Sequence, residues 1–111
     1  MADLNGKNIA IIATDGFEDS ELTSPKEAVE SAGATTKVIS TEDGEIEGKK
    51  GAKVAVNAKT AEASADEFDA LILPGGTVNA DTIRTDADAV ALVKAFKDAG
   101  KPIGVICHGG W

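Results

Sequence analysis

The only cysteine of this 111-residue chain, Cys107, lies where an apolar run, residues 102–106, meets the turn-prone string His108-Gly109-Gly110. A thiol at the tip of a sharp strand-to-helix turn is held out of the core, close to free backbone N–H groups. Such donors and the dipole of a following helix stabilise the thiolate. The pattern therefore predicts a cysteine nucleophile, which would also be open to oxidation to a sulfenic or sulfinic acid.

Each of these residues also has a purely structural interpretation. A lone cysteine is commonly a small buried hydrophobic residue, but the position at a strand end before His-Gly-Gly favours the nucleophile. His108, the only histidine, is either a structural residue with its hydrogen bonds satisfied or a proton-transfer base, and adjacency in sequence does not ensure that its ring reaches the sulfur.

A second candidate group is acidic and follows the first apolar run of the chain. Glu18 has three acidic neighbours, Asp15, Asp19 and Glu21. Such residues are usually solvated loop charges, but a carboxyl group in a sheltered pocket can stay protonated and hydrogen-bond a thiolate. The sequence does not decide which of the four acids would do so.

A third candidate is the turn Gly75-Gly76, which follows another apolar run. It is either a simple tight turn or a place where backbone N–H groups approach a reacting carbonyl. In the second case it would form half of an oxyanion hole, with the His108 N–H as the other half. Asp81 and Arg84 are, from the residues alone, loop charges. The chain has no glycine pattern that binds phosphates.

The elements that must position these residues alternate between strand and helix patterns. Strands are predicted at residues 8–13, 35–40, 69–73 and 102–106, of which the first and third have the pattern of buried strands. Helices are predicted at 24–33 and 86–99, and a small β excursion at 41–59 with short pieces at 45–47 and 53–56. This order indicates an α/β sandwich with a mainly parallel sheet. Ligands of such sheets gather outside the carboxyl ends of the strands, where all three candidates fall.

Composition limits the possible functions. The net charge of -8 and the pI near 4.5 disfavour nucleic acid and anionic membrane surfaces as partners. One cysteine and one histidine form neither an internal disulfide nor a cysteine-based zinc site, so no metal and no other cofactor is expected. No apolar run approaches the roughly 20 residues of a membrane span, and we expect a cytoplasmic protein.

Three separated motifs in the right order resemble the ThiJ/PfpI superfamily, in particular its intracellular-protease and general-stress-protein branch. The matching segments are residues 9–12 and 15–22 (IAII and DGFEDSEL), 68–76 (FDALILPGG), and 100–103 and 106–109 (GKPI and ICHG). The similarity covers nearly the whole chain. It implies a flavodoxin-like sandwich related to class I glutamine amidotransferase domains.

The resemblance also implies roles for particular residues. Cys107 would be the elbow nucleophile, Glu18 its carboxyl partner, and His108 would act with an acid donated by a neighbouring subunit, for which Asp81 is the matching position. The active site would then lie between subunits of a homo-oligomer, a dimer or a hexamer. The activities reported for the superfamily are peptidase, glyoxalase or deglycase activity on methylglyoxal adducts, and stress-linked chaperone functions.

Two departures from the family pattern affect the expectations. Gly110 stands where a proline is usual, which would loosen the start of the following helix. The family continues well past this motif, so residues 1–111 are expected to be the N-terminal part of a single domain, truncated after the elbow. The leading hypothesis is a cysteine-dependent hydrolase of peptides or of glyoxal-type carbonyls. The alternative is a non-catalytic redox-sensing or chaperone-like stress protein that uses an oxidisable Cys107.

Overall fold

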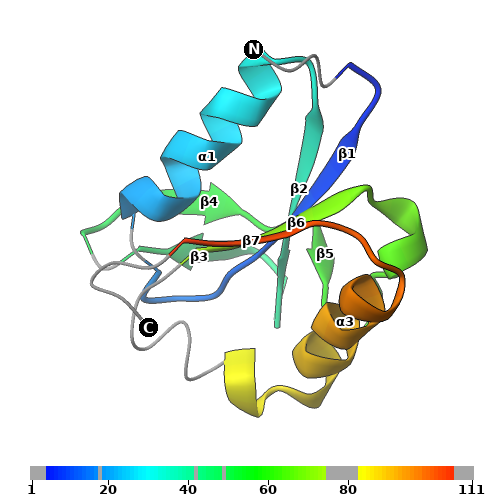
Figure 1. The fold of residues 1–111 in the computed structure, drawn as a ribbon. Coiled ribbons are helices and arrows are strands. Elements are labelled where there is room, and N and C mark those ends of the chain that lie inside the picture. The colour runs from blue at the N-terminus through cyan, green and yellow to red at the C-terminus, as the bar shows by residue number, and fades with distance from the viewer. Residues whose placement is uncertain (1–4, 18, 42, 49, 75–82, 107–111) are drawn as a thin grey trace.

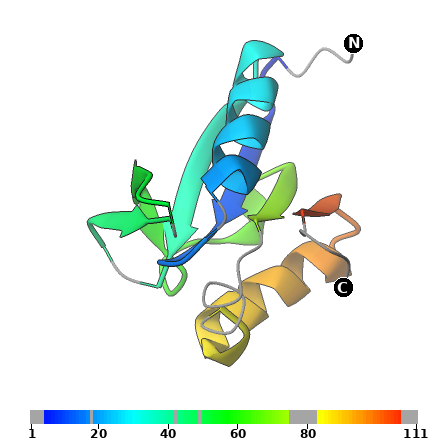
Figure 2. The same ribbon diagram turned by 90° about the vertical axis from the view of Figure 1, so that its left-hand side faces the viewer.

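The fold is a parallel β-sheet with one helix on each face (Figures 1 and 2). The computed structural model describes residues 5–17, 19–41, 43–48, 50–74 and 83–106. The main sheet has the order β5-β2-β1-β6-β7, and every pair of neighbours in it is parallel. Its strands are β1 (Asn8–Ile12), β2 (Thr35–Ser40), β5 (Ala58–Lys59), β6 (Ala70–Pro74) and β7 (Ile103–Ile106). The predicted α/β sandwich with a mainly parallel sheet is confirmed.

The other elements are two longer helices, a short 3-10 helix and a hairpin. They are α1 (Asp19–Ser31), η1 (Ala65–Glu67), α3 (Ala87–Asp98), and the antiparallel pair β3 (Glu45–Glu47) and β4 (Lys53–Ala55). Among the described residues, no helix is both long enough and apolar enough to cross a bilayer.

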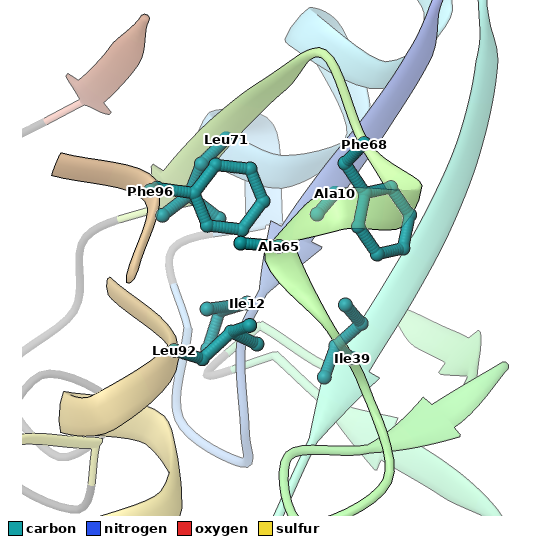
Figure 3. Close-up of a cluster of buried hydrophobic side chains, with 8 residues drawn as sticks. All are labelled: Ala10, Ile12, Ile39, Ala65, Phe68, Leu71, Leu92 and Phe96. Atoms are coloured by element: carbon teal, nitrogen blue, oxygen red, sulfur yellow. The ribbon is translucent and has the colours of Figure 1, made fainter. Parts of the chain in front are cut away.

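Two apolar clusters hold the helices to opposite faces of the sheet. On one face, Leu92 and Phe96 of α3 pack against Ile12 and Leu71, with Phe68 beside them (Figure 3). On the other face, Leu22 of α1 and Ile46 of β3 pack in a second cluster. Its other buried members are Ile11, Ala13, Phe17 and Val38. β1 supplies both clusters because its successive side chains point to opposite faces. The continuous apolar run of β1 therefore fits a central strand that is buried on both sides.

Helix α1 begins earlier than the sequence predicted. A helix starting at Ser24 and Pro25 was expected, but the helix starts at Asp19 and contains Pro25. Proline is most at home at the first position of a helix, which made residue 25 look like a start. Here Leu22 is fully buried and Asp19 is hydrogen-bonded to the hairpin region, and these tertiary contacts extend the helix past its proline.

The β excursion predicted at 41–59 is confirmed in part and contains more than was expected. The hairpin β3–β4 pairs Ile46 with Val54, close to the predicted pieces. The sequence predicted four strands in the main sheet, whereas β5 adds a fifth at the edge beside β2. The 3-10 helix η1 was not predicted, although Ser64 and Glu67 form a capping box around it.

Candidate functional site

Three strands bring their carboxyl ends to one edge of the sheet. β6 lies between β1 and β7, and the three are parallel. Ile11 pairs with Ile72, and Pro74 pairs with Ile106. Gly75 and Cys107 each directly follow one member of the second pair in the sequence.

The strand order reverses at this edge. The chain leaves β1 for β2 on one side, and β6 later takes the place on the other side of β1. In open parallel sheets such a reversal opens a crevice at the carboxyl ends of the strands, where ligands bind. The arrangement of β1, β6 and β7 thus defines a candidate active-site edge.

The candidate catalytic residues themselves lie outside the described residues. They are Glu18, Gly75, Gly76, Asp81, Cys107 and His108. What the structure describes is the framework on either side of them: the β1–α1 connection before Glu18, β6 before Gly75, and β7 before Cys107. The site is therefore built here from the elements that lead to these residues.

The β1–α1 connection is tied to the hairpin at Asp15 and Gly16. The Oδ1 atom of Asp15 accepts a hydrogen bond from the backbone N–H of Glu47 at 2.9 Å. The N–H of Gly16 donates to the carbonyl oxygen of Glu47, also at 2.9 Å. Gly16 has a φ of 83°, in the left-handed region that glycine adopts without steric cost. Phe17, the next residue, is fully buried.

The first residue of α1 is bound to the same hairpin region. One carboxylate oxygen of Asp19 accepts from the N–H of Lys50 at 3.0 Å, and the other accepts from the N–H of Ala52 at 2.8 Å. These hydrogen bonds, the one from Lys50 first, lower the pKa of Asp19, although desolvation opposes them. Asp19 is therefore held as a carboxylate.

These contacts show what two of the four acidic residues at positions 15 to 21 do in the fold. The carboxylates of Asp15 and Asp19 both accept backbone hydrogen bonds from the hairpin region. Glu21 also takes part in an interaction. Sequence reasoning treated Asp15 and Asp19 as candidate solvated charges. It missed their role because their partners lie 31 to 33 residues away.

The described residues on both sides of positions 75–82 are anchored in the fold. Pro74 is buried at the end of β6. On the far side, Asp86 caps α3 by accepting from the N–H of Ala89 at 2.9 Å. The hydroxyl of Thr60 also donates to the same Asp86 oxygen at 3.4 Å. Arg84, taken from the sequence as a loop charge, instead lies in the short helical stretch 83–85, where it is exposed and takes part in an interaction.

Strand β7, which leads to Cys107, is fixed at its start. The N–H of Leu71 donates to the carbonyl of Pro102 at 3.0 Å. The ammonium group of Lys101 donates to the carbonyl oxygens of Ala65 and Phe68. These contacts set the position of β7 along β6 and hence where the strand ends.

The described residues contain no group of three or more His, Cys, Asp or Glu side chains that could hold a metal ion. The chemistry that the sequence offers at this edge is that of a thiol, an imidazole, a carboxyl group and backbone N–H donors. The described part of the chain is therefore that of an α/β domain with a parallel sheet and a switch point, a class in which reactive groups are presented on the turns that follow the strands.

The comparison with protein families gives the same class. The profile of the DJ-1/PfpI family matches residues 7–111. The chain belongs to the DJ-1/PfpI family, as its resemblance to the ThiJ/PfpI superfamily predicted.

Named relatives span several functional descriptions. YraA of Bacillus subtilis, whose name marks it as a candidate cysteine protease, is 43% identical over 104 residues, 93% of this chain. General stress protein 18 of the same species is 43% identical over 106 residues, 94% of the chain. Protein/nucleic acid deglycase 2 of Escherichia coli is 43% identical over 105 residues, 93% of the chain. The chain spans about three fifths of these relatives, 61%, 61% and 60% of their lengths.

A solved structure confirms the fold. The structure of oxidized DJ-1 from Toxoplasma gondii superposes with a TM-score of 0.84 at 26% sequence identity. The match covers 92% of this chain and 56% of that one. The described sheet and helices are thus those of a DJ-1/PfpI domain over the part of the fold that the chain spans.

Proposed function

We propose that this chain carries the nucleophile of a cysteine-dependent hydrolase or deglycase that acts on peptides or on glyoxal- and methylglyoxal-type carbonyls. Relatives named as a cysteine protease candidate and as a deglycase support this class of enzyme. The observation that carries the proposal is the pairing of Pro74 with Ile106, because Gly75 and Cys107 follow these paired residues in the sequence.

The proposed reaction begins with the Cys107 thiolate. Its sulfur adds to the carbonyl carbon, a C–S bond forms, and the π electron pair moves to the carbonyl oxygen. The N–H groups of Gly75, Gly76 and His108 would stabilise that oxyanion, as in other acyl-transfer sites. The carboxyl group of Glu18, kept protonated, would hydrogen-bond the thiolate before the attack.

The second half of the proposed reaction needs proton transfer. For a peptide, collapse of the tetrahedral adduct expels the amine, which takes its proton from the His108 imidazolium. Water then hydrolyses the thioester, with the neutral His108 as the base. Asp81 of a neighbouring subunit would orient His108. For this reason we also propose a homo-oligomer. We further propose that the protein is cytoplasmic, because the thiol stays reduced in that compartment.

The test compares the purified full-length protein with its Cys107→Ser, His108→Ala and Glu27→Gln variants. Glu27 is exposed on α1 and serves as the matched surface control. Turnover is measured with a fluorogenic peptide and with a methylglyoxal-modified amine. We expect the first two variants to lose at least about a hundredfold in kcat, as expected when a nucleophile or proton-transfer group is removed. Unchanged rates in Cys107→Ser would refute the proposal.

A second candidate function is a non-catalytic, oxidant-sensing stress protein. A relative named as a general stress protein and a structural neighbour solved in an oxidized form favour it. Intact mass after dilute peroxide separates the two functions. Added oxygen at Cys107 together with no turnover of either substrate supports the sensor, whereas turnover without oxidation supports the enzyme.

A further inference from the structure

The hairpin region contacts the connection between β1 and α1 on both sides of position 18. On the β1 side, Asp15 and Gly16 bond to the backbone of Glu47. On the α1 side, the carboxylate of Asp19 bonds to the N–H groups of Lys50 and Ala52. These described residues of the β1–α1 connection therefore lie beside Glu47, Lys50 and Ala52, although more than thirty positions separate the two groups in sequence.

The contact at Asp19 is unusual for an acid in the first turn of a helix. Such a side chain ordinarily accepts from the free N–H groups of its own helix. Both carboxylate oxygens of Asp19 accept from the hairpin region, so these hydrogen bonds join two separate elements. This arrangement does more than cap the start of a helix, because it sets the direction of the chain as it enters α1.

Gly48 makes this close approach possible. A Cβ atom added to Gly48 would lie 2.6 Å from Cγ of Asp19 and would overlap its Oδ1 atom. Gly48 is buried, and its N–H donates to the carbonyl of Ala52 at 2.7 Å. The carboxylate thus rests directly on the backbone of residue 48, where any larger residue would displace it.

The residues on either side of position 18 are held as well. Phe17 and Leu22 are both fully buried in the cluster beneath α1. In the sequence, position 18 therefore stands between two residues that are held in place: Phe17 is buried, and Asp19 is hydrogen-bonded. We propose that Asp19 is a positioning residue: by binding the 48–52 segment it fixes the chain that presents Glu18 to the nucleophile. This inference rests on the proposed function, in which Glu18 is the carboxyl partner of Cys107.

The experiment substitutes Asp19→Asn and, separately, Gly48→Ala in the full-length protein. The amide of Asn keeps one acceptor but turns an N–H donor toward the second backbone N–H. Gly48→Ala displaces the carboxylate and leaves its charge unchanged, so it carries the same test if Asp19→Asn fails to fold. Glu27→Gln removes one negative charge from the exposed face of the same helix and is the control.

Three measurements are made on each variant: backbone amide exchange, steady-state kinetics, and the pH profile of Cys107 alkylation by iodoacetamide. In both test variants we expect amide exchange at Lys50 and Ala52 to quicken roughly tenfold, since each N–H loses its hydrogen bond to a charged acceptor. We expect kcat to fall between about tenfold and a hundredfold with KM little changed, as misplacement of a catalytic group does. The midpoint of alkylation should rise, because the thiolate loses its hydrogen-bond partner.

The outcomes separate this inference from the proposed function. Faster exchange with kinetics and alkylation equal to those of Glu27→Gln would make the contact structural only and overturn the positioning role. Unchanged exchange would also overturn it, because the contact would not exist in solution. If the unmodified protein shows no turnover, the proposed enzyme fails, and the alkylation profile alone decides whether Asp19 acts on the environment of Cys107.

Discussion

Lys101 holds the end of the short helix η1 through Phe68: its ammonium nitrogen lies 2.6 Å from the carbonyl oxygen of Phe68. The same nitrogen donates to the carbonyl of Ala65 at 2.7 Å. The carbonyl of Ala65 also accepts from the N–H of Phe68, so Lys101 adds a charged donor to that carbonyl as well as to the carbonyl of Phe68. Lys101 also stands two residues before β7, and the contact therefore joins η1 to the strand that leads to Cys107.

Replacing Lys101 with Met should destabilise the protein. The change keeps most of the side-chain length but leaves two carbonyl groups without their charged donor, at a cost of about 1 to 3 kcal/mol in the free energy of unfolding. Lys94→Met on the exposed face of α3 is the control and should change that free energy by less than about 0.5 kcal/mol. Urea titration measures both. Equal midpoints for the two variants would show that the Lys101 contacts contribute nothing.

The side chain of Asn57 is hydrogen-bonded to the backbone of Val38, and this contact gives a second prediction. Its Oδ1 atom accepts from the N–H of Val38 at 2.7 Å, and its own N–H donates to the carbonyl of Val38 at 2.8 Å. Asn57→Ala should cost about 1 to 3 kcal/mol, because the N–H of a residue that is 1% exposed loses its acceptor. Asn57→Asp retains an acceptor oxygen and should be the more stable of the two variants in urea titration. If Asp proves as destabilising as Ala, the hydrogen bond is not the cause.

The strands near Asn57 illustrate which part of the fold could be predicted from the sequence and which part could not. β1 is a buried run with a clear signal, and β2, whose last three residues are buried, has the predicted bounds of 35–40. β5 is only Ala58–Lys59, with no apolar run of its own. Its place follows from pairing with β2 beside the Asn57 contact, which is tertiary. A two-residue strand of this kind has no local pattern to recognise.

Part of the candidate site could likewise be predicted from the sequence, and part of it could not. The strand ends before Gly75 and Cys107 could be predicted, because an apolar run that stops at small, turn-prone residues marks a strand end. The role of Asp19 could not, since its partners are backbone N–H groups 31 and 33 positions away. Backbone donors are the same in every non-proline residue, so no side-chain pattern reveals them.

The stacked pair Phe68 and Phe96 gives a third prediction. Their ring centroids are 6.2 Å apart, and Phe96 is fully buried between α3 and the sheet (Figure 3). Phe96→Ala should lower the free energy of unfolding by about 3 to 5 kcal/mol, through lost apolar burial and the cavity left behind. Val90→Ala, on the same helix but 48% exposed, should change it by no more than about 0.5 kcal/mol. Comparable losses in the two variants would contradict the assignment of Phe96 to the core.

The lowered pKa of Asp19 predicts how stability depends on pH. Hydrogen bonds from the backbone N–H groups, that of Lys50 foremost, favour the carboxylate, so the pKa of Asp19 in the folded state lies below its usual value of 3.8. A group with a lowered pKa in the folded state adds stability above its unfolded pKa, and that contribution disappears as the pH falls through the folded pKa. Unfolding of the protein and of Asp19→Asn should therefore be compared from about pH 6 to about pH 2, the range in which a carboxyl group of this kind titrates. The difference in stability between the two should be constant above pH 3.8 and shrink below it. A difference that stays constant through the whole acid range would mean that the carboxylate form of Asp19 does not stabilise the fold.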